Sequence, residues 1–380
     1  MLSNPKGRPT FCLIDLEAIR WNFRQARNKV GAGVKILSVV KANAYGHGVR
    51  EVASTLEDEG TDTFGVATVE EGIELRNEGS KLPVLVLGGV FPEQLDTLHE
   101  HNLIPVVSEM ETLCRLEEIA QSRRISLDFH LKVDTGMGRI GFLASEVDSW
   151  LPDLAKLEAL KLQGLLSHFS QADSVEGDYT QQQIESFRHV LQRLRSEGHH
   201  PPLNHLANSA AVITLRSAYF TMVRPGLMLY GIYPSTKMSS QVNLKPVLSW
   251  KTRILQLKRV PKGFRISYGQ TFVTRRESLI ATLPVGYADG YKRLLSNRGA
   301  VLVRGQRAPI AGSVCMDLTM VDVTGIRGVQ QGDEVVLLGQ QGGQAISADE
   351  MAGWGNTISY EILTSIGARV PRIPDSKKGA

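Results

Sequence analysis

Between residues 35 and 230, eight short apolar runs alternate with amphipathic segments, and this alternation restricts the possible folds more than any other feature of the chain. The runs are KILSVV (35–40), FGVAT (64–68), PVLVLG (83–88), IPVVS (104–108), SLDFHLKV (126–133), LQGLLSHF (162–169), LNHLAN (203–208) and FTMV (220–223). Runs that are apolar throughout indicate strands covered on both faces, as in a parallel sheet.

The segments between these runs have the pattern of helices. VREVASTLEDEG, VEEGIELRNEG and QQIESFRHVLQRLRSEG each end in glycine, which is favoured at helix C-termini. Eight strand–helix units predict an α/β fold that begins with a (β/α)8 TIM-type barrel. An open doubly wound sheet is the alternative, but the GxGxxG motif that would favour it is absent after the first strand.

After about residue 240 the pattern changes to strand-like runs separated by glycine-rich turns, followed by one helical segment. The runs are SWKTRILQLKRV, LIATLPVGYADG, AVLVRG, TMVDVTG and DEVVLLGQ, and the helical segment is SADEMAGWGNTISYEILTSIG. The sequence therefore predicts a barrel domain over residues 1–240 and a mostly β C-terminal domain over residues 241–380. The boundary falls in the polar stretch Lys237–Leu244, and roughly the first 12 residues are candidates to pack on the C-terminal domain.

Composition excludes several classes of function. The net charge is +4 and there is no long basic run, which argues against nucleic-acid binding. The three cysteines (Cys12, Cys114 and Cys315) are too far apart for a disulfide framework or a zinc site. The N-terminus does not resemble a secretion signal, and no apolar segment is long enough to span a bilayer. We therefore expect a cytoplasmic protein without a membrane partner or a metal.

Polar side chains follow five of the predicted barrel strands. Lys41 follows the first strand, Arg139 the fifth, His168 the sixth, Asn208-Ser209 the seventh and Arg224 the eighth. In a (β/α)8 barrel the C-terminal strand ends meet at the face that carries the chemistry. A single histidine at such a position is more often a hydrogen-bonded core residue. Five polar sites on one face instead indicate an active site.

The last two of these loops have the features of a phosphate site. Asn208-Ser209 opens an apolar helical run, which offers a hydroxyl and backbone N–H groups at a positive helix end, although an ordinary helix cap would look the same. Gly226 would allow a phosphate to approach the backbone. A lysine opposite a phosphate site suits pyridoxal 5'-phosphate, because the amine forms a Schiff base with its aldehyde.

The sequence resembles a known family, the alanine racemases, which are fold-type III pyridoxal phosphate enzymes with an N-terminal barrel and a C-terminal β domain. The motifs that carry the resemblance are VVKANAYGHG, KVDTGMGRIG, HFSQAD, NSA, VRPGLMLYG, SYGQTF, LPVGYADGY, SVCMDLTMVDV and ISYEIL. They cover nearly the whole chain in the expected order, which makes the signal specific.

The resemblance implies roles for the residues around the cofactor. Lys41 matches the Schiff-base lysine, which is also one catalytic base. Arg224 matches the arginine that faces the pyridine nitrogen, and His168 matches the histidine beside the ring. The contacts to the phosphate are implied for Tyr45, Tyr360, Asn208, Ser209 and the backbone of Gly226 and Leu227.

The resemblance also implies roles around the substrate. Tyr268 matches the second catalytic base, which the family supplies from the partner subunit, so a homodimer with composite active sites follows. Arg139 matches the arginine near the phenolic oxygen and the substrate carboxylate, and Lys132 matches a lysine that is carbamylated in many relatives and holds that arginine. Met316 would offer its backbone N–H to the substrate carboxylate. The remaining residues of this set, which play a supporting part, are Tyr287 in the entry corridor and Asp317.

Racemisation explains the need for two bases, because the α-proton leaves one face and returns to the other. A tyrosine is a weak base, since its ordinary pKa is about 10, unless nearby positive charge favours its anion. We hypothesise that Arg224 and His168 supply this effect to Tyr268 through hydrogen bonds. An unshifted pH–rate profile in Arg224→Lys would count against the hypothesis. Arg224 would also leave the pyridine nitrogen unprotonated, which shortens the carbanion's lifetime and favours reprotonation over transamination.

Three alternatives remain open at this stage. A barrel-type pyridoxal phosphate decarboxylase would share the lysine and the phosphate site but would place an acid at the pyridine nitrogen, where this chain has Arg224. A broad-specificity amino-acid racemase would commonly carry a secretion signal. A non-catalytic pyridoxal phosphate-binding protein would resemble the barrel alone. The sequence favours an alanine racemase, an isomerase that supplies D-alanine for peptidoglycan, and leaves its strictness for alanine over serine undecided.

Overall fold

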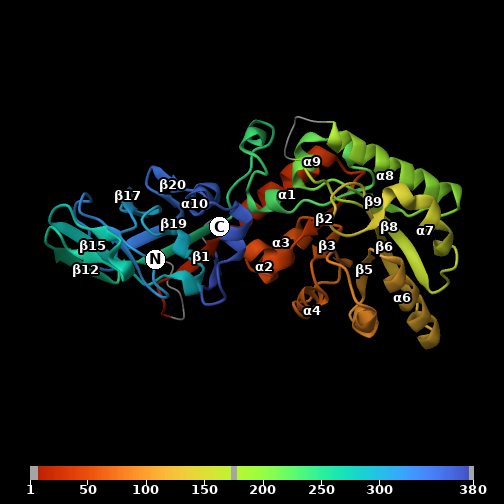
Figure 1. Ribbon diagram of the computed structural model, residues 1–380, viewed down its shortest axis with the longest axis horizontal. Helices are drawn as coiled ribbons and strands as arrows, with labels where there is room; N and C mark the ends of the chain where they lie inside the picture. Colours follow the sequence, from red (N-terminus) through yellow and green to blue (C-terminus); the bar gives the residue numbers. More distant parts are fainter. Residues whose placement is uncertain (1–6, 173–177, 376–380) are drawn as a thin grey trace. The chain divides into compact units, whose positions relative to one another are not determined.

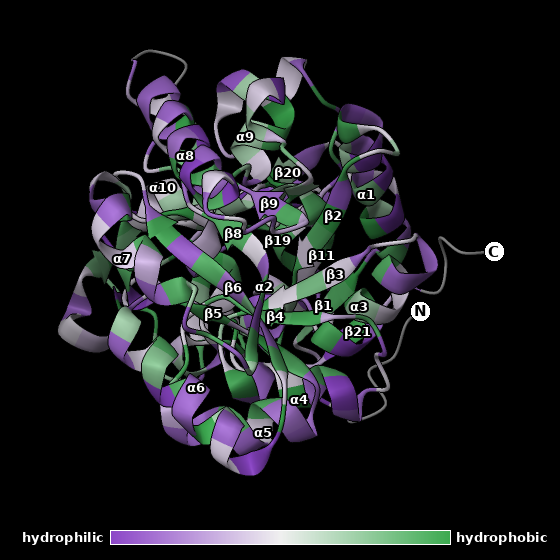
Figure 2. Ribbon diagram, turned by 90° about the vertical axis from the view of Figure 1, so that its right-hand side faces the viewer, coloured by the Kyte–Doolittle hydropathy of each residue, from purple (hydrophilic) through white to green (hydrophobic). Residues whose placement is uncertain are grey.

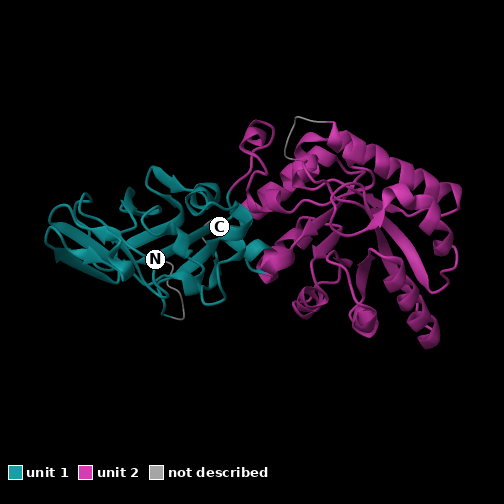
Figure 3. Ribbon diagram, in the orientation of Figure 1, with its two compact units in different colours: residues 1–17, 45–48, 246–380 teal, residues 18–44, 49–245 magenta. Residues whose placement is uncertain are grey.

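The computed structural model describes residues 7–172 and 178–375, and these divide into two compact units. Residues 18–44 and 49–245 form the barrel unit, and residues 7–17, 45–48 and 246–375 form the β unit (Figure 3). The barrel unit ends at residue 245 instead of 240. The start of the chain belongs to the β unit, because β1 (Phe11–Ile14) pairs with β11 (Leu248–Arg253) and β21 (Arg372–Pro374). The β unit therefore contains strands from both ends of the chain.

The barrel unit contains the predicted eight parallel strands (Figure 1). They are β2 (Lys35–Val39), β3 (Thr63–Val66), β4 (Val84–Val86), β5 (Leu103–Val107), β6 (Leu127–Asp134), β8 (Leu160–Leu166), β9 (Leu203–His205) and β10 (Met222–Val223). Each pairs in parallel with the next, and β10 pairs with β2, so the sheet closes. A two-residue strand, β7 (Phe142–Leu143), pairs with β6. The predicted (β/α)8 barrel is confirmed.

Helices cover the outside of this barrel. They are α1 (Leu16–Val30), α3 (Val49–Asp58), α4 (Val69–Asn77), α5 (Leu95–Glu100), α6 (Met110–Arg123), α7 (Val147–Leu154), α8 (Tyr179–Ser196) and α9 (Ser209–Thr214). In α8 the buried side chains Ile184, Phe187, Leu191 and Leu194 recur at the three- and four-residue spacing of one helix face. The exposed face of α8 is hydrophilic (Figure 2).

The β unit is built from three antiparallel or mixed sheets. The largest has the strand order β17-β16-β19-β11-β1-β21, with β20 paired to β19; a second has the order β12-β15-β18; and β13 pairs with β14. The strands not yet given are β12 (Gln256–Val260), β13 (Arg265–Ile266), β14 (Phe272–Val273), β15 (Ser278–Leu283), β16 (Ala300–Val303), β17 (Gln306–Pro309), β18 (Thr319–Asp322), β19 (Glu334–Gln341) and β20 (Gln344–Ile346). The predicted β-rich C-terminal domain is confirmed.

The late helical segment consists of two helices rather than one. α10 (Ala348–Gly355) ends at Asn356, whose left-handed backbone (φ 51°) stops the helix, and α11 (Ser359–Thr364) follows. Within the described ranges, the protein has no helix with the length and apolar character needed to cross a membrane.

Candidate active site

Five of the predicted site residues lie just beyond the C-terminal ends of barrel strands. Lys41 and His168 lie two residues beyond the ends of β2 and β8, and Arg224 follows β10 directly. Asn208 and Arg139 lie in the loops after β9 and β6. Because every barrel strand runs in the same direction, these residues lie at one mouth of the barrel.

The mouth is strongly positive, as the environment of His168 shows. Burial lowers the pKa of this histidine well below its ordinary value, and the charges of Arg224, Lys132, Arg139 and Lys41 lower it further. Four cations therefore lie close enough to act on one imidazole, which remains neutral near pH 7. Such a group of cations suits a ligand that carries a phosphate and a carboxylate.

Lys41 has the properties of a reactive amine. Burial and the charge of Arg139 lower its pKa, while Glu71 opposes the shift. The carboxylate of Glu71 accepts hydrogen bonds from the backbone N–H groups of Ala42 and Ala67, both at 2.7 Å, and so fixes the start of the loop behind the lysine. The structure thus places a partly desolvated amine at the end of β2.

The turn after Lys41, α2 (Lys41–Gly46), is left-handed. The φ angles are 53°, 52°, 53° and 53° from Ala42 to Tyr45 and 82° at Gly46. Left-handed helical backbone costs about 1–2 kcal/mol for each non-glycine residue. Runs of such residues persist only where the surrounding structure imposes them, and they gather at functional sites.

Ala42→Gly is therefore expected to leave the protein as stable as before or to stabilise it by up to about 1 kcal/mol, a rise of a few degrees in apparent Tm. Ala42 is exposed and lies in this left-handed turn, where glycine has no steric penalty. In a right-handed helix the same change costs about 1 kcal/mol. A thermal melt of the cofactor-loaded protein measures the difference, and a loss of several degrees would contradict the interpretation.

Arg224 is buried and surrounded by acceptors. Its Nη1 donates to the His205 carbonyl at 2.6 Å and to His205 Nδ1 at 3.0 Å. Its Nη2 donates to the carbonyls of Ser167 (2.6 Å) and Leu206 (3.2 Å) and lies 3.3 Å from His168 Nδ1. Backbone and side-chain contacts therefore fix the guanidinium at the mouth of the barrel.

These contacts also fix the protonation of the neighbouring histidines. Because a guanidinium only donates, Nδ1 of both His168 and His205 accepts, and the remaining proton of each ring is on Nε2. His205 Nε2 then donates to His130 Nδ1, 2.8 Å away. Burial, with the charge of Arg224, lowers the pKa of His130 to about 3. The two histidines that are hydrogen-bonded in series behind Arg224 are therefore neutral near pH 7. Burial and Arg139 lower the pKa of Arg224 itself to about 9.

Lys132 lies in β6, and Arg139 lies in the loop that follows it. Burial, Arg224 and Arg139 lower the pKa of Lys132 to about 7, whereas Asp134 raises it. Asp134 Oδ1 accepts from the N–H groups of Gly136 and Met137 at 2.7 Å, and Oδ2 accepts from the Arg139 N–H at 3.1 Å. The loop is thus wound around one carboxylate, which fixes where Arg139 leaves the backbone.

In the predicted phosphate site, some of the polar groups already form hydrogen bonds with one another. Asn208 caps α9, as the simpler interpretation of this motif expected. Ser209 Oγ accepts from the N–H groups of Gly226 (2.9 Å) and Met228 (3.3 Å), so the Gly226 N–H is engaged rather than free. A hydroxyl has two acceptor positions and one donor, so Ser209 keeps its proton to donate to an anion.

In the β unit, Tyr45 and Tyr360 lie together. Their ring centroids are 6.1 Å apart, and burial, with the neighbouring Tyr360, raises the pKa of Tyr45, so its hydroxyl is a donor at neutral pH. Gly46 makes this arrangement possible, because a Cβ there would lie 2.2 Å from the Leu363 carbonyl oxygen. Arg372 Nε donates to the Gly46 carbonyl at 2.9 Å and secures the turn.

Gly46→Ala is therefore expected to weaken pyridoxal phosphate binding by at least about tenfold, because the clash with Leu363 displaces Tyr45. The matched control is Gly198→Ala. Gly198 has nearly the same φ (84° against 82°) but has no atom within 4 Å of its Cβ position. Equal cofactor affinities for the two variants, measured by absorbance titration, would show that the close approach has no role.

The other predicted site residues of the β unit lie on exposed loops. Tyr268 is 74% exposed and Met316 is 53% exposed. Tyr287 lies on the loop that is joined to the Met316 loop by backbone hydrogen bonds of 3.0 Å. Asp317 accepts from Arg369 Nη2 at 2.7 Å, which supports the same loop.

Three residues of this architecture were not predicted from the sequence. His205 and His130 extend the contacts of Arg224 into the barrel, and Arg372 secures the Tyr45 turn. A histidine in the middle of each of two apolar runs, LNHLAN and SLDFHLKV, was the available signal. Arg372 gave no signal, because its partners are backbone carbonyls, which carry no side-chain pattern, and the one that secures the turn, Gly46, is 326 residues away in the sequence.

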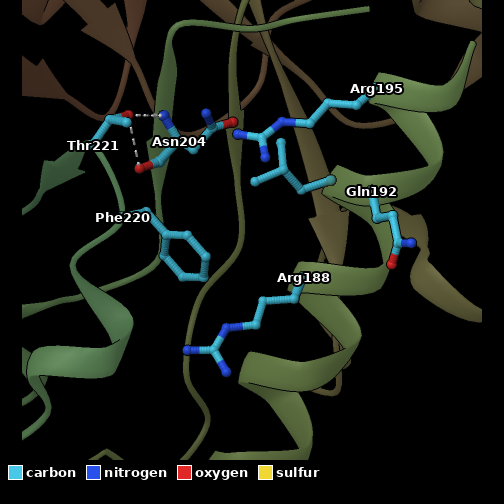
Figure 4. A pocket seen from close by; sticks show the side chains of 7 residues that line it. Arg188, Gln192, Arg195, Asn204, Phe220 and Thr221 are labelled. Atoms are coloured by element: carbon cyan, nitrogen blue, oxygen red, sulfur yellow. Dashed lines mark hydrogen bonds between the residues drawn. The ribbon is translucent and has the colours of Figure 1, made fainter.

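A surface cavity of about 390 Å³ lies away from these residues. It is formed by α8 and by the segments around the beginnings of β9 and β10 (Figure 4), and is lined by Arg188, Leu191, Gln192, Arg195, Asn204, Phe220 and Thr221. Strand beginnings lie at the opposite end of a parallel barrel from strand ends. No candidate site residue lines this cavity. The evidence for the candidate site is instead the group of basic side chains at the C-terminal ends of the barrel strands.

The residues described fit pyridoxal phosphate. The barrel unit offers an amine with a lowered pKa at Lys41, a donor hydroxyl at Ser209 and the positive mouth around Arg224. The β unit offers the protonated hydroxyl of Tyr45. These are the groups that an aldehyde, a phosphate and an unprotonated ring nitrogen require.

Comparisons with known proteins agree with this chemistry. Residues 14–234 match the model of the alanine racemase N-terminal domain, and residues 247–374 match that of its C-terminal domain. The chain is 50% identical over 372 residues to the alanine racemase of Halothermothrix orenii, covering 98% of both chains. It is 47% identical to that of Carboxydothermus hydrogenoformans, covering 96% of this chain and 99% of the relative.

Solved structures give the same result. The alanine racemase of Bacillus anthracis with bound L-Ala-P superposes with a TM-score of 0.92 at 37% identity, covering 98% of this chain and 96% of that one. The alanine racemase of Bartonella henselae with covalently bound pyridoxal phosphate superposes with a TM-score of 0.88 at 31% identity, covering 96% and 99%. The chain therefore belongs to the alanine racemase family over the length of both its domains.

Proposed function

We propose that this member of the alanine racemase family interconverts L-alanine and D-alanine with two proton carriers, Lys41 and Tyr268, on opposite faces of pyridoxal phosphate. The observation that carries the proposal is the amine of Lys41, with its lowered pKa, at the end of β2 beside a cluster of cations. A lowered pKa leaves more of the amine neutral near pH 7, which is the form that accepts a proton.

The cofactor, when bound, supplies an electron sink that acidifies the substrate's α-proton. The residues of the chain then hold and move that proton. Lys41 accepts it on one face, and the phenol of Tyr268 donates another on the opposite face. In the reverse direction the two exchange roles, so the tyrosine must act as a base, and positive charge relayed from Arg224 through His168 would favour its anion.

We assign the phosphate to a set of donors, because a dianion needs several hydrogen bonds. They are Tyr45, Tyr360, the Ser209 hydroxyl and the backbone N–H of Leu227, which donates to no other residue in the described part of the chain. Asn208 and Gly226 shape the site, since Asn208 caps α9 and Gly226 binds Ser209. Arg224 holds the ring nitrogen unprotonated, and His168 stays neutral beside it.

The substrate carboxylate is assigned to Arg139 and to the backbone N–H of Met316. Tyr287 borders the path by which substrate enters, and Asp317 holds its own loop through Arg369. Because Tyr268 is 74% exposed in the single chain, we propose that it completes the active site of a second copy in a homodimer. We also propose a cytoplasmic location and a role in D-alanine supply for peptidoglycan.

We further propose that Lys132 is carbamylated. At a pKa of about 7 much of this amine is neutral at pH 8, and its nitrogen can attack CO2. A C–N bond forms, one C=O electron pair moves to oxygen, and the nitrogen releases a proton to solvent. The resulting anion would offset the charge of Arg139.

With 13C-labelled bicarbonate, the protein is therefore expected to show a carbamate carbon resonance in NMR at pH 8. The signal should decline as the pH falls through about 7, where the amine becomes protonated. Lys132→Gln should abolish the signal, whereas Lys156→Gln, which removes a fully exposed lysine, should not. A signal that survives in Lys132→Gln would place the carbamate elsewhere.

The function is tested by incubating the purified, cofactor-loaded chain with L-alanine and measuring D-alanine. We expect conversion to an equal mixture from either enantiomer. Release of CO2 would instead identify a decarboxylase, and equal rates on a panel of larger amino acids would identify a broad-specificity racemase. Bound cofactor without turnover would favour a binding protein.

A further inference from the structure

The loop that carries Tyr268 is held through its backbone. The Tyr268 ring is 74% exposed, and no residue among 7–172 and 178–375 forms a hydrogen bond with its hydroxyl. Ser267 before it has φ 64° and ψ −177°, and Gly269 and Gln270 after it have φ 72° and 52°. The conformation of Ser267 is one that essentially only glycine adopts without strain.

Two serines on facing segments hold this strained peptide by reciprocal hydrogen bonds. Ser267 Oγ donates to the Ser313 carbonyl at 2.6 Å, and Ser313 Oγ donates to the Tyr268 carbonyl at 3.0 Å. Cys315 Sγ lies 3.4 Å from Ser267 Oγ on the same segment. The two carbonyls and two hydroxyls form a clamp that spans Ser267 and Tyr268.

The facing segment is itself fixed. A Cβ at Gly312 would lie 2.7 Å from the Ile266 carbonyl oxygen and 2.9 Å from Ser267 Cβ, so the two segments touch through a glycine. The Gly312 N–H donates to Asn297 Oδ1 at 2.7 Å. The clamp is therefore anchored through Asn297 to the segment between β15 and β16.

We infer that Ser267 and Ser313 are positioning residues, which hold Tyr268 where the second proton transfer requires it. The inference rests on the proposed role of Tyr268 as a base. A strained backbone relaxes when its restraints are removed, and here relaxation rotates the backbone on either side of the Tyr268 Cα, from which the tyrosine side chain projects. Because an exposed ring has few other contacts, its place is set by this backbone, and a shift of about 1 Å in a catalytic group can cost about 10²-fold in rate.

The test uses variants that remove each arm of the clamp separately. Ser267→Ala removes the bond to the Ser313 carbonyl, and Ser313→Ala removes the bond to the Tyr268 carbonyl. Ser267→Gly also relieves the strain, so the fold is preserved even if alanine destabilises it. Ser278→Ala is the matched control, because Ser278 is buried in the same unit and donates to a carbonyl at 3.1 Å outside this loop.

We expect kcat/KM to fall by about 10- to 100-fold in the three clamp variants, with the apparent Tm of Ser267→Gly within a few degrees of the parent. The double variant Ser267→Ala/Ser313→Ala should lose less than the product of the single effects, since both bonds hold one peptide. Values of kcat/KM within twofold of Ser278→Ala would overturn the inference.

A second readout separates positioning from general damage. The α-deuterium isotope effect on kcat/KM should rise for the enantiomer whose proton Tyr268 removes and fall for the other, because only the tyrosine step is slowed. Damage to the whole site would leave the two isotope effects unchanged relative to each other, and that result would also overturn the inference. Ser267→Thr, which keeps the hydroxyl, should recover more activity than Ser267→Ala.

Tyr268→Phe distinguishes the inference from the function on which it rests. If Tyr268→Phe racemises alanine as fast as the parent, the proposed base is wrong and so is the inference. If Tyr268→Phe is inactive and the clamp variants behave as Ser278→Ala, the base stands and only the positioning role is excluded.

Discussion

Lys41→Ala is expected to lower kcat/KM for racemisation by at least about 10⁴-fold from either enantiomer, because one residue supplies both a covalent link to the cofactor and a base. The structure gives the physical reason. Burial and Arg139 lower the pKa of this amine, and the backbone behind it is fixed by Glu71. No other lysine joins the end of a barrel strand to a left-handed turn in the described part of the chain.

Borohydride reduction followed by denatured mass measurement checks the covalent role. The parent should carry one cofactor mass per chain and Lys41→Ala should carry none. Lys35→Ala is the control, because Lys35 is an exposed lysine at the beginning of the same strand, and it should label and turn over as the parent does. Cofactor that stays attached in Lys41→Ala would remove the basis of the proposed function.

The barrel could be predicted because its signal is local. Runs such as KILSVV and PVLVLG are apolar on both strand faces, and each strand lies within or within two residues of its predicted run. The ends of those runs also gave Lys41, His168 and Arg224, since topology alone puts strand ends at one mouth.

The remaining features depend on contacts that the sequence pattern does not contain. The turn from Ala42 to Gly46 reads as an ordinary helical stretch, and its left-handedness follows from packing such as the approach of Gly46 to Leu363. The hydrogen bonds from Arg224 to His205 and from His205 to His130 connect residues of three different strand regions, which come together only when the barrel closes. The roles of Tyr268 and Met316 came from the family resemblance alone.

The boundary between the two units also depends on contacts between residues that are distant in the sequence. β1 (Phe11–Ile14) begins in the stretch that was named from the sequence as a candidate to pack on the C-terminal domain, and its register with Trp250 and Arg372 assigns it to the β unit. Strand partners are chosen over hundreds of residues, whereas the alternation that predicts a strand extends over fewer than ten.

Arg224→Glu is expected to lower racemisation by about 10²- to 10³-fold and to raise the share of turnovers that end in transamination. A carboxylate opposite the ring nitrogen would favour its protonation, which delocalises the carbanion and lengthens its lifetime. The same change removes a cation beside His168 and His205 and adds an anion, so the pKa values of both imidazoles should rise from their lowered values. Parent enzyme and variant are compared by measuring enantiomer exchange and pyruvate in the same reaction.

The structure adds a stability cost that the sequence did not reveal. The Arg224 guanidinium meets the carbonyls of His205, Ser167 and Leu206, and a glutamate there would face three acceptors without a donor. Arg224→Lys keeps the charge and should racemise with little transamination, although it meets fewer of these carbonyls. Arg195→Glu, the same charge reversal on the exposed face of α8, should change neither product. An unchanged ratio of pyruvate to exchanged alanine in a folded Arg224→Glu enzyme would show that the arginine does not control the fate of the carbanion.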